Sequence, residues 1–161
     1  MPLGANEVNQ HPKRTVCGIA VDIYSIVIPD KYDPTAIPGA WQKFWAEFPK
    51  SDLSDNYESW GVSTPIEGSQ GQLRYVAGVE VAADYVAPIG FELVTIHPGN
   101  FLEVTHTGPI STLAQSYGEA YGVVFPSTGL EMRAGQHLEL YDERLKPMDD
   151  NYEMKILIPV N

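Results

Sequence analysis

The residues best suited to chemistry lie in a short segment at 137–143. If this segment is a strand, His137, Glu139 and Tyr141 share one face, and two leucines take the other. The leucines indicate a strand in the interior of a sheet. A carboxylate there must be solvated, be paired with another group, or have a function in binding or catalysis. An unpaired carboxylate is costly to bury, and burial raises its pKa. The segment therefore predicts either a glutamate on the solvated face of the sheet or a functional carboxylate.

Two other strand glutamates raise the same question. Glu80 lies between two valines near the end of a predicted strand at 73–81, and Glu103 shares a face with Phe101 and Thr105. A general base needs a carboxylate with a raised pKa within hydrogen-bond reach of water. We expect Glu139 or Glu80 to take this role if the protein is an enzyme, and Glu103 is a weaker candidate for the site.

Aromatic residues at helical spacing accompany these acids. Trp41, Phe44, Trp45 and Phe48 follow the i, i+3, i+4, i+7 pattern of a helix, which Pro49 ends. The two tryptophans cannot join the stripe of the two phenylalanines unless that stripe is very wide. We expect the phenylalanines in the core, and one tryptophan either in the core or lining a cavity.

The segment that carries this helix occurs twice. Residues 37–48 resemble residues 110–121, and each copy is followed by two strand-like segments. An offset of 79 residues relates the closing strands and makes Trp60 the counterpart of Glu139. Small ligands bind preferentially where two such units meet. We expect Trp60 and Glu139 to face a groove between the halves, as a clamp for a planar cation.

The order of the predicted elements indicates the fold class. Strand, helix, strand, strand occurs twice, which predicts an α+β fold: a duplicated unit with pseudo-twofold symmetry and two helices packed on an antiparallel sheet. We expect a flexible N-terminal tail at 1–13 and a domain at 14–161, with half-repeats of about 14–86 and 87–161. The first strand is predicted to end at Pro29.

Composition restricts the function further. The chain has 161 residues, of which 43% are hydrophobic and 19% charged, as expected of one folded domain. Its net charge of −11 argues against direct binding to nucleic acid or to anionic membranes, because both need a basic face. The charge is compatible with a cationic or neutral small ligand, with a basic protein partner, or with an acidic solvated surface alone.

Several familiar signatures are absent from the sequence. The single cysteine, Cys17, lies in an apolar run and cannot form an intramolecular disulfide, so we expect a buried thiol and a cytoplasmic protein. We find no signal peptide and no apolar stretch of membrane-spanning length. The four histidines lack metal-ligand spacing, and neither a phosphate-binding glycine loop nor a nucleophile elbow occurs. We therefore expect no metal and no cofactor.

Seven short stretches recur in the order seen in one known family: 60–63, 75–81, 88–92, 96–101, 107–110, 138–141 and 156–160. From about residue 14 to the end, the chain resembles the GyrI-like (gyrase-inhibitor-like) small-molecule-binding domains. Such domains also form the C-terminal ligand domain of AraC-type and MerR-type multidrug-responsive activators. The resemblance implies the same duplicated fold.

The resemblance also implies a function. Members bind amphipathic, often cationic molecules in the groove between the halves, and a strand glutamate after the second helix supplies negative charge; Glu139 matches that position. Some stand-alone members are hydrolases that open cyclopropane rings with pocket glutamates, tyrosine and tryptophan. This chain lacks a helix-turn-helix segment, so we do not expect it to be a DNA-binding activator itself. Trp60 stands where tyrosine is more usual, which favours flat, stacking ligands.

We expect a stand-alone binder of amphipathic, aromatic or cationic small molecules. The candidate ligand-binding residues are Glu139, Tyr141, Trp60, Trp41, Trp45, Glu80, Tyr24, Tyr75 and Tyr117. The first alternative is a hydrolase that opens cyclopropane-type alkylating compounds, with Glu139 or Glu80 beside the hydroxyl of Tyr141 or Tyr75. The second is an acidic protein-interaction module that inhibits a partner such as gyrase.

Overall fold

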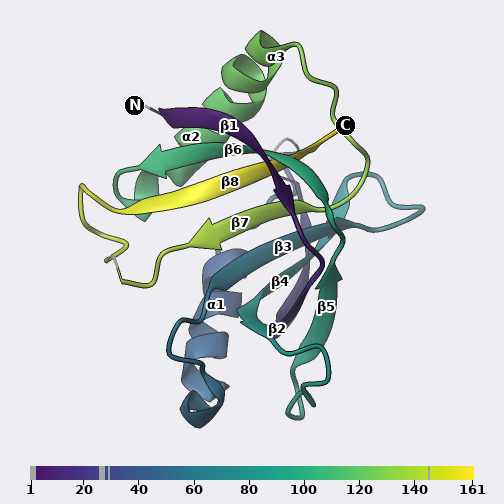
Figure 1. The fold of residues 1–161 in the computed structure, drawn as a ribbon, viewed down its shortest axis with the longest axis vertical. Coiled ribbons are helices and arrows are strands. Elements are labelled where there is room, and N and C mark those ends of the chain that lie inside the picture. Colours follow the sequence, from purple (N-terminus) through teal and green to yellow (C-terminus); the bar gives the residue numbers. More distant parts are fainter. Residues whose placement is uncertain (1–2, 26–27, 29, 145) are drawn as a thin grey trace. The chain divides into compact units, whose positions relative to one another are not determined.

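The computed structural model describes residues 3–25, 28, 30–144 and 146–161, so the predicted strand end at Pro29 lies outside the described residues. The chain forms two compact units (Figure 1). The middle unit comprises residues 13–97. The terminal unit combines residues 98–161 with the N-terminal segment up to residue 12.

The middle unit is an antiparallel sheet with one long helix. In chain order its elements are β2 (Arg14–Tyr24), α1 (Ala36–Glu47), the 3₁₀ turn η1 (Lys50–Asp52), β3 (Ser59–Pro65), β4 (Gln72–Val81) and β5 (Glu92–Ile96). The strands are ordered β3-β4-β2-β5. Helix α1 tolerates Pro38 in its first turn and ends before Pro49, where the proline cannot continue the helical hydrogen bonds.

Helix α1 packs on one face of this sheet. Phe44 and Phe48 lie in a core with alternate residues of two strands, including Cys17 and Ile19 of β2 and Ala77 of β4. The helical spacing of the phenylalanines brings both rings to the sheet, as predicted. Residues of the other parity on β2, β3 and β4 therefore point away from α1.

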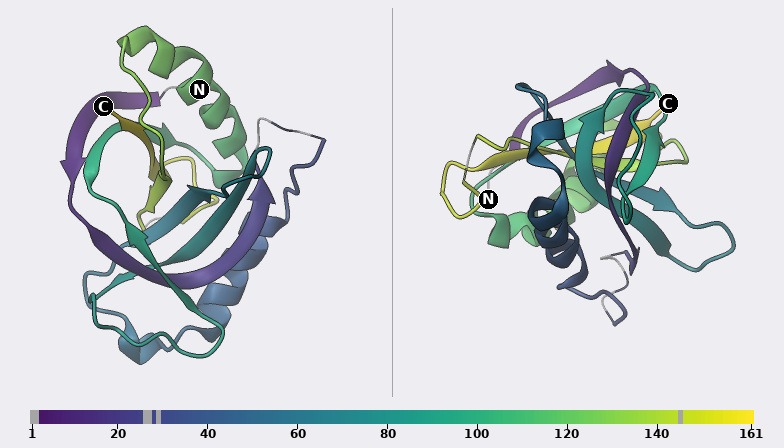
Figure 2. Two further views of the ribbon diagram at one scale, coloured as in Figure 1. Left: turned by 90° about the vertical axis from the view of Figure 1, so that its right-hand side faces the viewer. Right: turned by 90° about the horizontal axis from the view of Figure 1, so that it is seen from below.

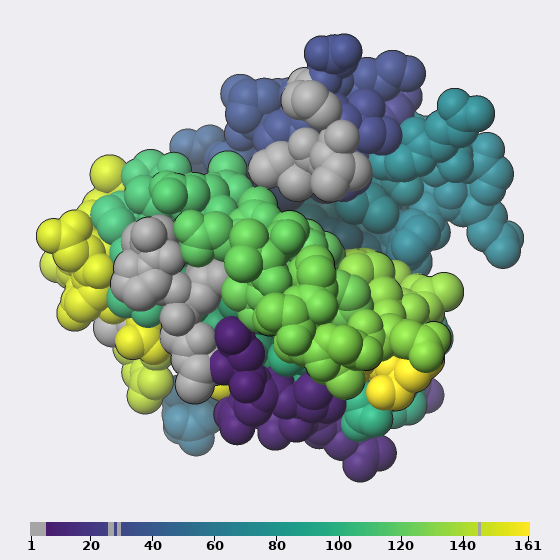
Figure 3. Space-filling model, turned by 90° about the horizontal axis from the view of Figure 1, so that it is seen from above, coloured from purple at the N-terminus to yellow at the C-terminus, as the bar shows by residue number. Residues whose placement is uncertain are grey.

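The terminal unit repeats this topology. Its elements are β1 (Leu3–His11), β6 (Gly99–Thr107), η2 (Ile110–Thr112), α2 (Leu113–Glu119), the π-helical turn η3 (Ala120–Val124), α3 (Phe125–Thr128), β7 (His137–Tyr141) and β8 (Glu153–Val160). The strands are ordered β1-β6-β8-β7. The outer side of the helical segment appears as the green surface in Figure 3. Gly129 ends it in a left-handed conformation (φ 72°).

The duplication predicted from the sequence is confirmed at the level of topology. In the middle unit β2 pairs with β4, β4 pairs with β3, and α1 connects β2 to β3. In the terminal unit β6 pairs with β8, β8 pairs with β7, and the helical segment connects β6 to β7. The pairing is antiparallel throughout, so the α+β class is confirmed as well. Each unit also carries one strand outside this repeat, namely β5 beside β2 and β1 beside β6.

The expected boundaries need correction. The N-terminal tail was expected to be loose, but residues 3–11 form β1, which pairs with β6 from Leu3 opposite His106 to His11 opposite Gly99. The expected half-repeats met at residues 86 and 87. Instead β5 pairs with β2 in the middle unit, and the division falls between residues 97 and 98.

The predicted equivalence of Trp60 and Glu139 is wrong by one residue. Trp60 lies opposite Gly78 on the face of β3 that points away from α1. Glu139 lies opposite Ile156, on the face of β7 that packs with α2. Because side chains alternate along a strand, a shift of one residue moves a side chain to the other face. At the 79-residue offset of the closing strands, Ile156 corresponds to Ala77, and Ala77 faces Gly61 rather than Trp60.

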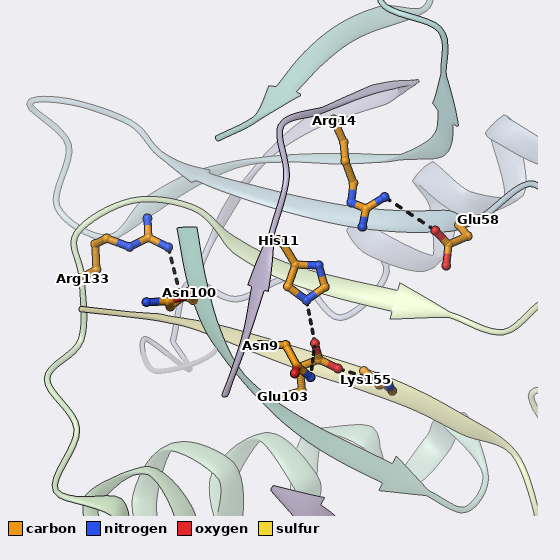
Figure 4. A network of polar contacts seen from close by, with 8 residues as sticks. All are labelled: Asn9, His11, Arg14, Glu58, Asn100, Glu103, Arg133 and Lys155. Atoms are coloured by element: carbon orange, nitrogen blue, oxygen red, sulfur yellow. Dashed lines mark hydrogen bonds and ion pairs between the residues drawn. The ribbon is translucent and has the colours of Figure 1, made fainter. Parts of the chain in front are cut away.

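A buried carboxylate explains why a polar N-terminal strand is held in place (Figure 4). Glu103 of β6, whose side chain is 7% exposed, accepts hydrogen bonds from Asn9 (3.1 Å), His11 (2.6 Å) and Lys155 (3.1 Å). The first two donors lie on β1 and the third on β8. Burial tends to raise the pKa of Glu103, but the three hydrogen bonds outweigh it and hold the pKa below the ordinary value of 4.5.

This network makes a prediction about acid stability. A carboxyl group with a lowered folded-state pKa stabilises the protein above its unfolded pKa, and the contribution is lost as the pH falls through the folded value. We expect Glu103→Gln to lower the unfolding free energy by about 1–3 kcal/mol at pH 7, and the difference from wild type to shrink below pH 4.5. Urea titrations at several pH values measure this, with the exposed Glu67→Gln as control. A difference that does not change with pH contradicts the assignment.

Two glycines set the close approach of β2 and β4, where β2 curves strongly (left panel of Figure 2). Gly18 and Gly78 face each other, and a Cβ on either would lie 2.1 Å from a backbone oxygen of the neighbouring strand. We expect Gly78→Ala to destabilise the protein by about 3 kcal/mol or more, because the clash is with the backbone and cannot relax cheaply.

Gly39 in α1 provides the matched control, because a Cβ there meets nothing within 4 Å. Gly39→Ala should be neutral or stabilising by up to about 1 kcal/mol, since alanine favours the helix. Equal unfolding free energies for the two variants, measured in urea, would refute the close-approach argument.

Candidate ligand-binding site

Glu139 lies on the helix-facing side of β7 and is 6% exposed. Tyr141, two residues along the strand, donates its hydroxyl hydrogen to Oε1 at 2.7 Å, and Tyr117 from α2 donates to Oε2. Each carboxylate oxygen therefore accepts one hydrogen bond from a tyrosine. The structure thus brings together three of the residues predicted for the site, and places the carboxylate on a buried rather than a solvated face.

A second polar pair lies beside this one. The hydroxyl of Tyr121 is 2.6 Å from Nδ1 of His137, and the ring of Tyr121 stacks on that of Tyr117, with centroids 6.1 Å apart and planes 13° from parallel. Burial, aided by the charge of Glu139, raises the pKa of Tyr121. Burial, aided by the charge of Arg133, lowers the pKa of His137 below 6.5. The neutral imidazole is therefore the acceptor and the tyrosine hydroxyl the donor.

The helical segment explains how both tyrosines reach β7. Tyr117 and Tyr121 are four residues apart, which places them on one side of a helix. The π-helical turn begins at Ala120. Pro126 follows it and has no N–H for the carbonyl of Gly122, so a regular α-helical hydrogen bond is lost there. π-Helical turns inside α-helices are frequent at functional sites.

A buried histidine anchors the start of this helix to β6. Nε2 of His106 lies 3.0 Å from the carbonyl oxygen of Gly108 and must donate to it, so Nδ1 accepts the hydroxyl hydrogen of Ser116 at 2.6 Å. Ser116 immediately precedes Tyr117. The pair therefore fixes the turn of α2 that presents Tyr117 to Glu139.

The middle unit holds the other predicted residues, and the predicted glutamate among them, Glu80, forms an ion pair. Arg14 bonds to Glu80 at 3.0 Å, lies 3.8 Å from Glu58, and stacks its guanidinium 5.0 Å from the ring centroid of Trp60. The cation expected over Trp60 is thus supplied by the chain itself. Tyr75 and Glu80 have opposite parity on β4 and point to opposite faces, so these two candidates do not form an acid–hydroxyl pair with each other.

The tryptophans of α1 form an aromatic group on the helix-facing side of the middle unit. Trp41 donates its indole N–H to the hydroxyl of Tyr75 at 2.9 Å and stacks on Trp45, with centroids 6.4 Å apart. Both indoles are half-buried and pack against the core. Tyr24 lies at the end of β2, where Lys31 approaches its ring at 5.1 Å. Their role in ligand binding stays a prediction, as does the expected groove between the halves.

Two further features bear on the chemistry. Cys17 is buried, as expected, and burial, with the nearby charge of Asp52, raises its pKa to about 11, so it is not a nucleophile at neutral pH. A surface pocket of about 270 Å³ in the middle unit contains none of the predicted residues; Arg74 and Glu92, which pair with each other, lie in its wall.

Within the described parts of the chain, no three metal-ligating side chains are grouped as a metal site would require. Over the same residues, no helix combines the length and the apolarity needed to cross a membrane.

The chain is similar to the transcriptional regulator BrlR of Pseudomonas aeruginosa, with 29% identity over 122 residues, which cover 74% of this chain and 44% of BrlR. The chain therefore spans less than half the length of that relative.

Solved structures share the fold at low sequence identity. The integron cassette protein VCH_CASS2 from Vibrio cholerae has a TM-score of 0.74 at 15% identity, over 99% of this chain and 97% of that one. SAV2435 bound to tetraphenylphosphonium has a TM-score of 0.74 at 18% identity, over 98% and 94%. A hydrolase encoded by lin2189 of Listeria innocua has a TM-score of 0.58 at 15% identity, over 97% and 91%.

The family model of the GyrI-like small molecule binding domain matches residues 23–161, so the chain belongs to this family.

Proposed function

We propose that the protein binds lipophilic organic cations, with Glu139 as the charge partner. The observation that carries the proposal is a buried carboxylate whose two oxygens each accept a tyrosine hydroxyl. Hydroxyl donors fix the position of a carboxylate without cancelling its charge. A buried negative charge among aromatic rings attracts a cation strongly, because little water screens it.

The same geometry favours one class of cation. Because each oxygen of Glu139 already accepts a hydrogen bond, the carboxylate has less capacity for further N–H donors than a free one. Quaternary and phosphonium cations interact through charge and apolar surface and need no such donors. Family membership supports small-molecule binding, and the structure of SAV2435, which shares the fold, has tetraphenylphosphonium bound. The net charge of −11 favours the approach of cations.

The walls of the proposed site differ from those first expected. Trp60 is stacked by Arg14, so we assign the aromatic wall to Tyr117, Tyr121 and Tyr141 instead. Stacked and edge-on aromatic contacts suit flat or multi-ring ligands. The further prediction that the protein inhibits a partner such as gyrase stays a prediction.

The test is a pair of ligands that differ in charge. Tetraphenylphosphonium should bind with roughly micromolar affinity, about −8 kcal/mol, and Glu139→Gln should weaken it by about tenfold or more, because the amide carries no charge. A neutral triaryl phosphine oxide should lose no more than about twofold. Isothermal titration calorimetry measures both, with Glu153→Gln, exposed on the opposite face of its sheet, as the charge-matched control. Equal losses for the two ligands would remove Glu139 from the role.

A second candidate function is hydrolysis, which the Glu139–Tyr141 pair also suits. A buried carboxylate could take a proton from water, while the adjacent hydroxyl steadies charge developing on an opening ring. We expect Tyr141→Phe to abolish turnover of a cyclopropane-bearing alkylating compound while leaving its binding largely intact, since only the transition state needs that donor. Mass spectrometry for the gain of one water decides the question. No product from wild-type protein that binds the compound would exclude this function.

A further inference from the structure

The stacked tyrosines of the terminal unit are tied to β7 at two points, and only one of them involves the proposed charge partner. Tyr117 bonds to Glu139, whereas Tyr121 bonds to His137 at 2.6 Å. The imidazole also lies against the ring of Tyr121, with centroids 5.7 Å apart. His137 therefore fixes both the hydroxyl and the ring plane of Tyr121, and the parallel stack passes that constraint on to Tyr117.

With the Tyr121 hydroxyl as donor, the hydrogen bond between this pair exists only while the imidazole is neutral. A neutral imidazole accepts the Tyr121 hydroxyl hydrogen at Nδ1, whereas an imidazolium is a donor at both nitrogens and cannot accept it. Protonation therefore removes the acceptor for the Tyr121 hydroxyl hydrogen, and any remaining bond must run the other way, from the imidazolium N–H to the tyrosine oxygen. It also places a positive charge two residues along β7 from Glu139, which corresponds to about 6.5 Å.

We propose that His137 is a positioning residue of the Glu139 site: it holds Tyr121, and through it Tyr117, while its imidazole is neutral, and it weakens cation binding when it is protonated. The inference rests on the proposed function and adds a pH dependence to the same site. The lowered pKa of His137 supports it, because the neutral form then predominates at pH 7.

Several polar and charged groups surround His137 and affect its protonation. Tyr121 approaches from the helical segment, Arg133 from the loop before β7, and Glu139, with its donors Tyr117 and Tyr141, from the same sheet face. Arg133 disfavours protonation of the imidazole, and Glu139 favours it. A ligand cation near Glu139 should add to the effect of Arg133, so binding and protonation of His137 oppose each other.

The experiment measures the affinity for tetraphenylphosphonium between pH 5 and pH 8 by calorimetry. Wild-type affinity should fall about tenfold as the pH decreases through the His137 titration, because a like charge arises close to the ligand. His137→Asn should keep wild-type affinity at pH 7.5 within about twofold, since its amide oxygen takes the place of Nδ1 and can accept from Tyr121, and should lose most of the pH dependence. His137→Leu, which offers Tyr121 no acceptor, should bind more weakly than His137→Asn at every pH. His97→Gln, an exposed histidine of the middle unit, should behave as wild type.

A measurement without ligand makes the inference testable by itself. NMR titration of the His137 ring should give a pKa below 6.5, and Tyr121→Phe should raise it, because the lost donor had stabilised the neutral imidazole. An unchanged His137 titration in Tyr121→Phe overturns the pair. Wild-type pH dependence retained in His137→Asn overturns only the pH role, while Glu139→Gln still tests the binding site. A wild-type protein that binds no cation at any pH overturns both proposals.

Discussion

The terminal unit is organised around the cost of burying the carboxylate of Glu139. Removing a charge from water costs several kcal/mol unless hydrogen bonds compensate. Here the compensation comes from two hydroxyls that must arrive from different directions, one along β7 and one from α2. The Ser116–His106 bond and the π-helical turn both serve that requirement, because each fixes where the helix presents its tyrosines.

Two other glutamates with restricted exposure, Glu103 and Glu80, meet the same cost in different ways. Glu103 is compensated by donors that include a lysine, and Glu80 by the guanidinium of Arg14. In both cases a basic side chain cancels much of the negative charge, and the interaction serves the structure, holding β1 in the first case. Two of the hydrogen bonds to Glu139 come instead from tyrosine hydroxyls, which carry no charge. The proposal of a ligand site at Glu139 therefore rests on the chemistry of these donors as well as on burial.

The sequence predicts the local patterns well and the long-range ones poorly. Strand alternation places Glu139 beside Tyr141, and helical spacing places Phe44 in the core, because both depend only on neighbours in the chain. The Tyr121–His137 pair was missed, although its two signals were present: tyrosines four residues apart, and a histidine on the face of Glu139. Strand β1 was missed because its polar side chains gain their partner, Glu103, from 92 residues away.

Duplication preserved the topology of the two units but not their chemistry. At the position in the middle unit that corresponds to Glu139 the chain has Gly61, which offers no side chain, and the neighbouring Trp60 points to the other face. A repeat inferred from similar residues is therefore reliable for strand order and unreliable for which side chain faces the helix, since one residue of slip reverses the face. The described middle unit therefore carries no carboxylate at the position that matches Glu139. The symmetry of the fold therefore does not predict a second cation site in the middle unit.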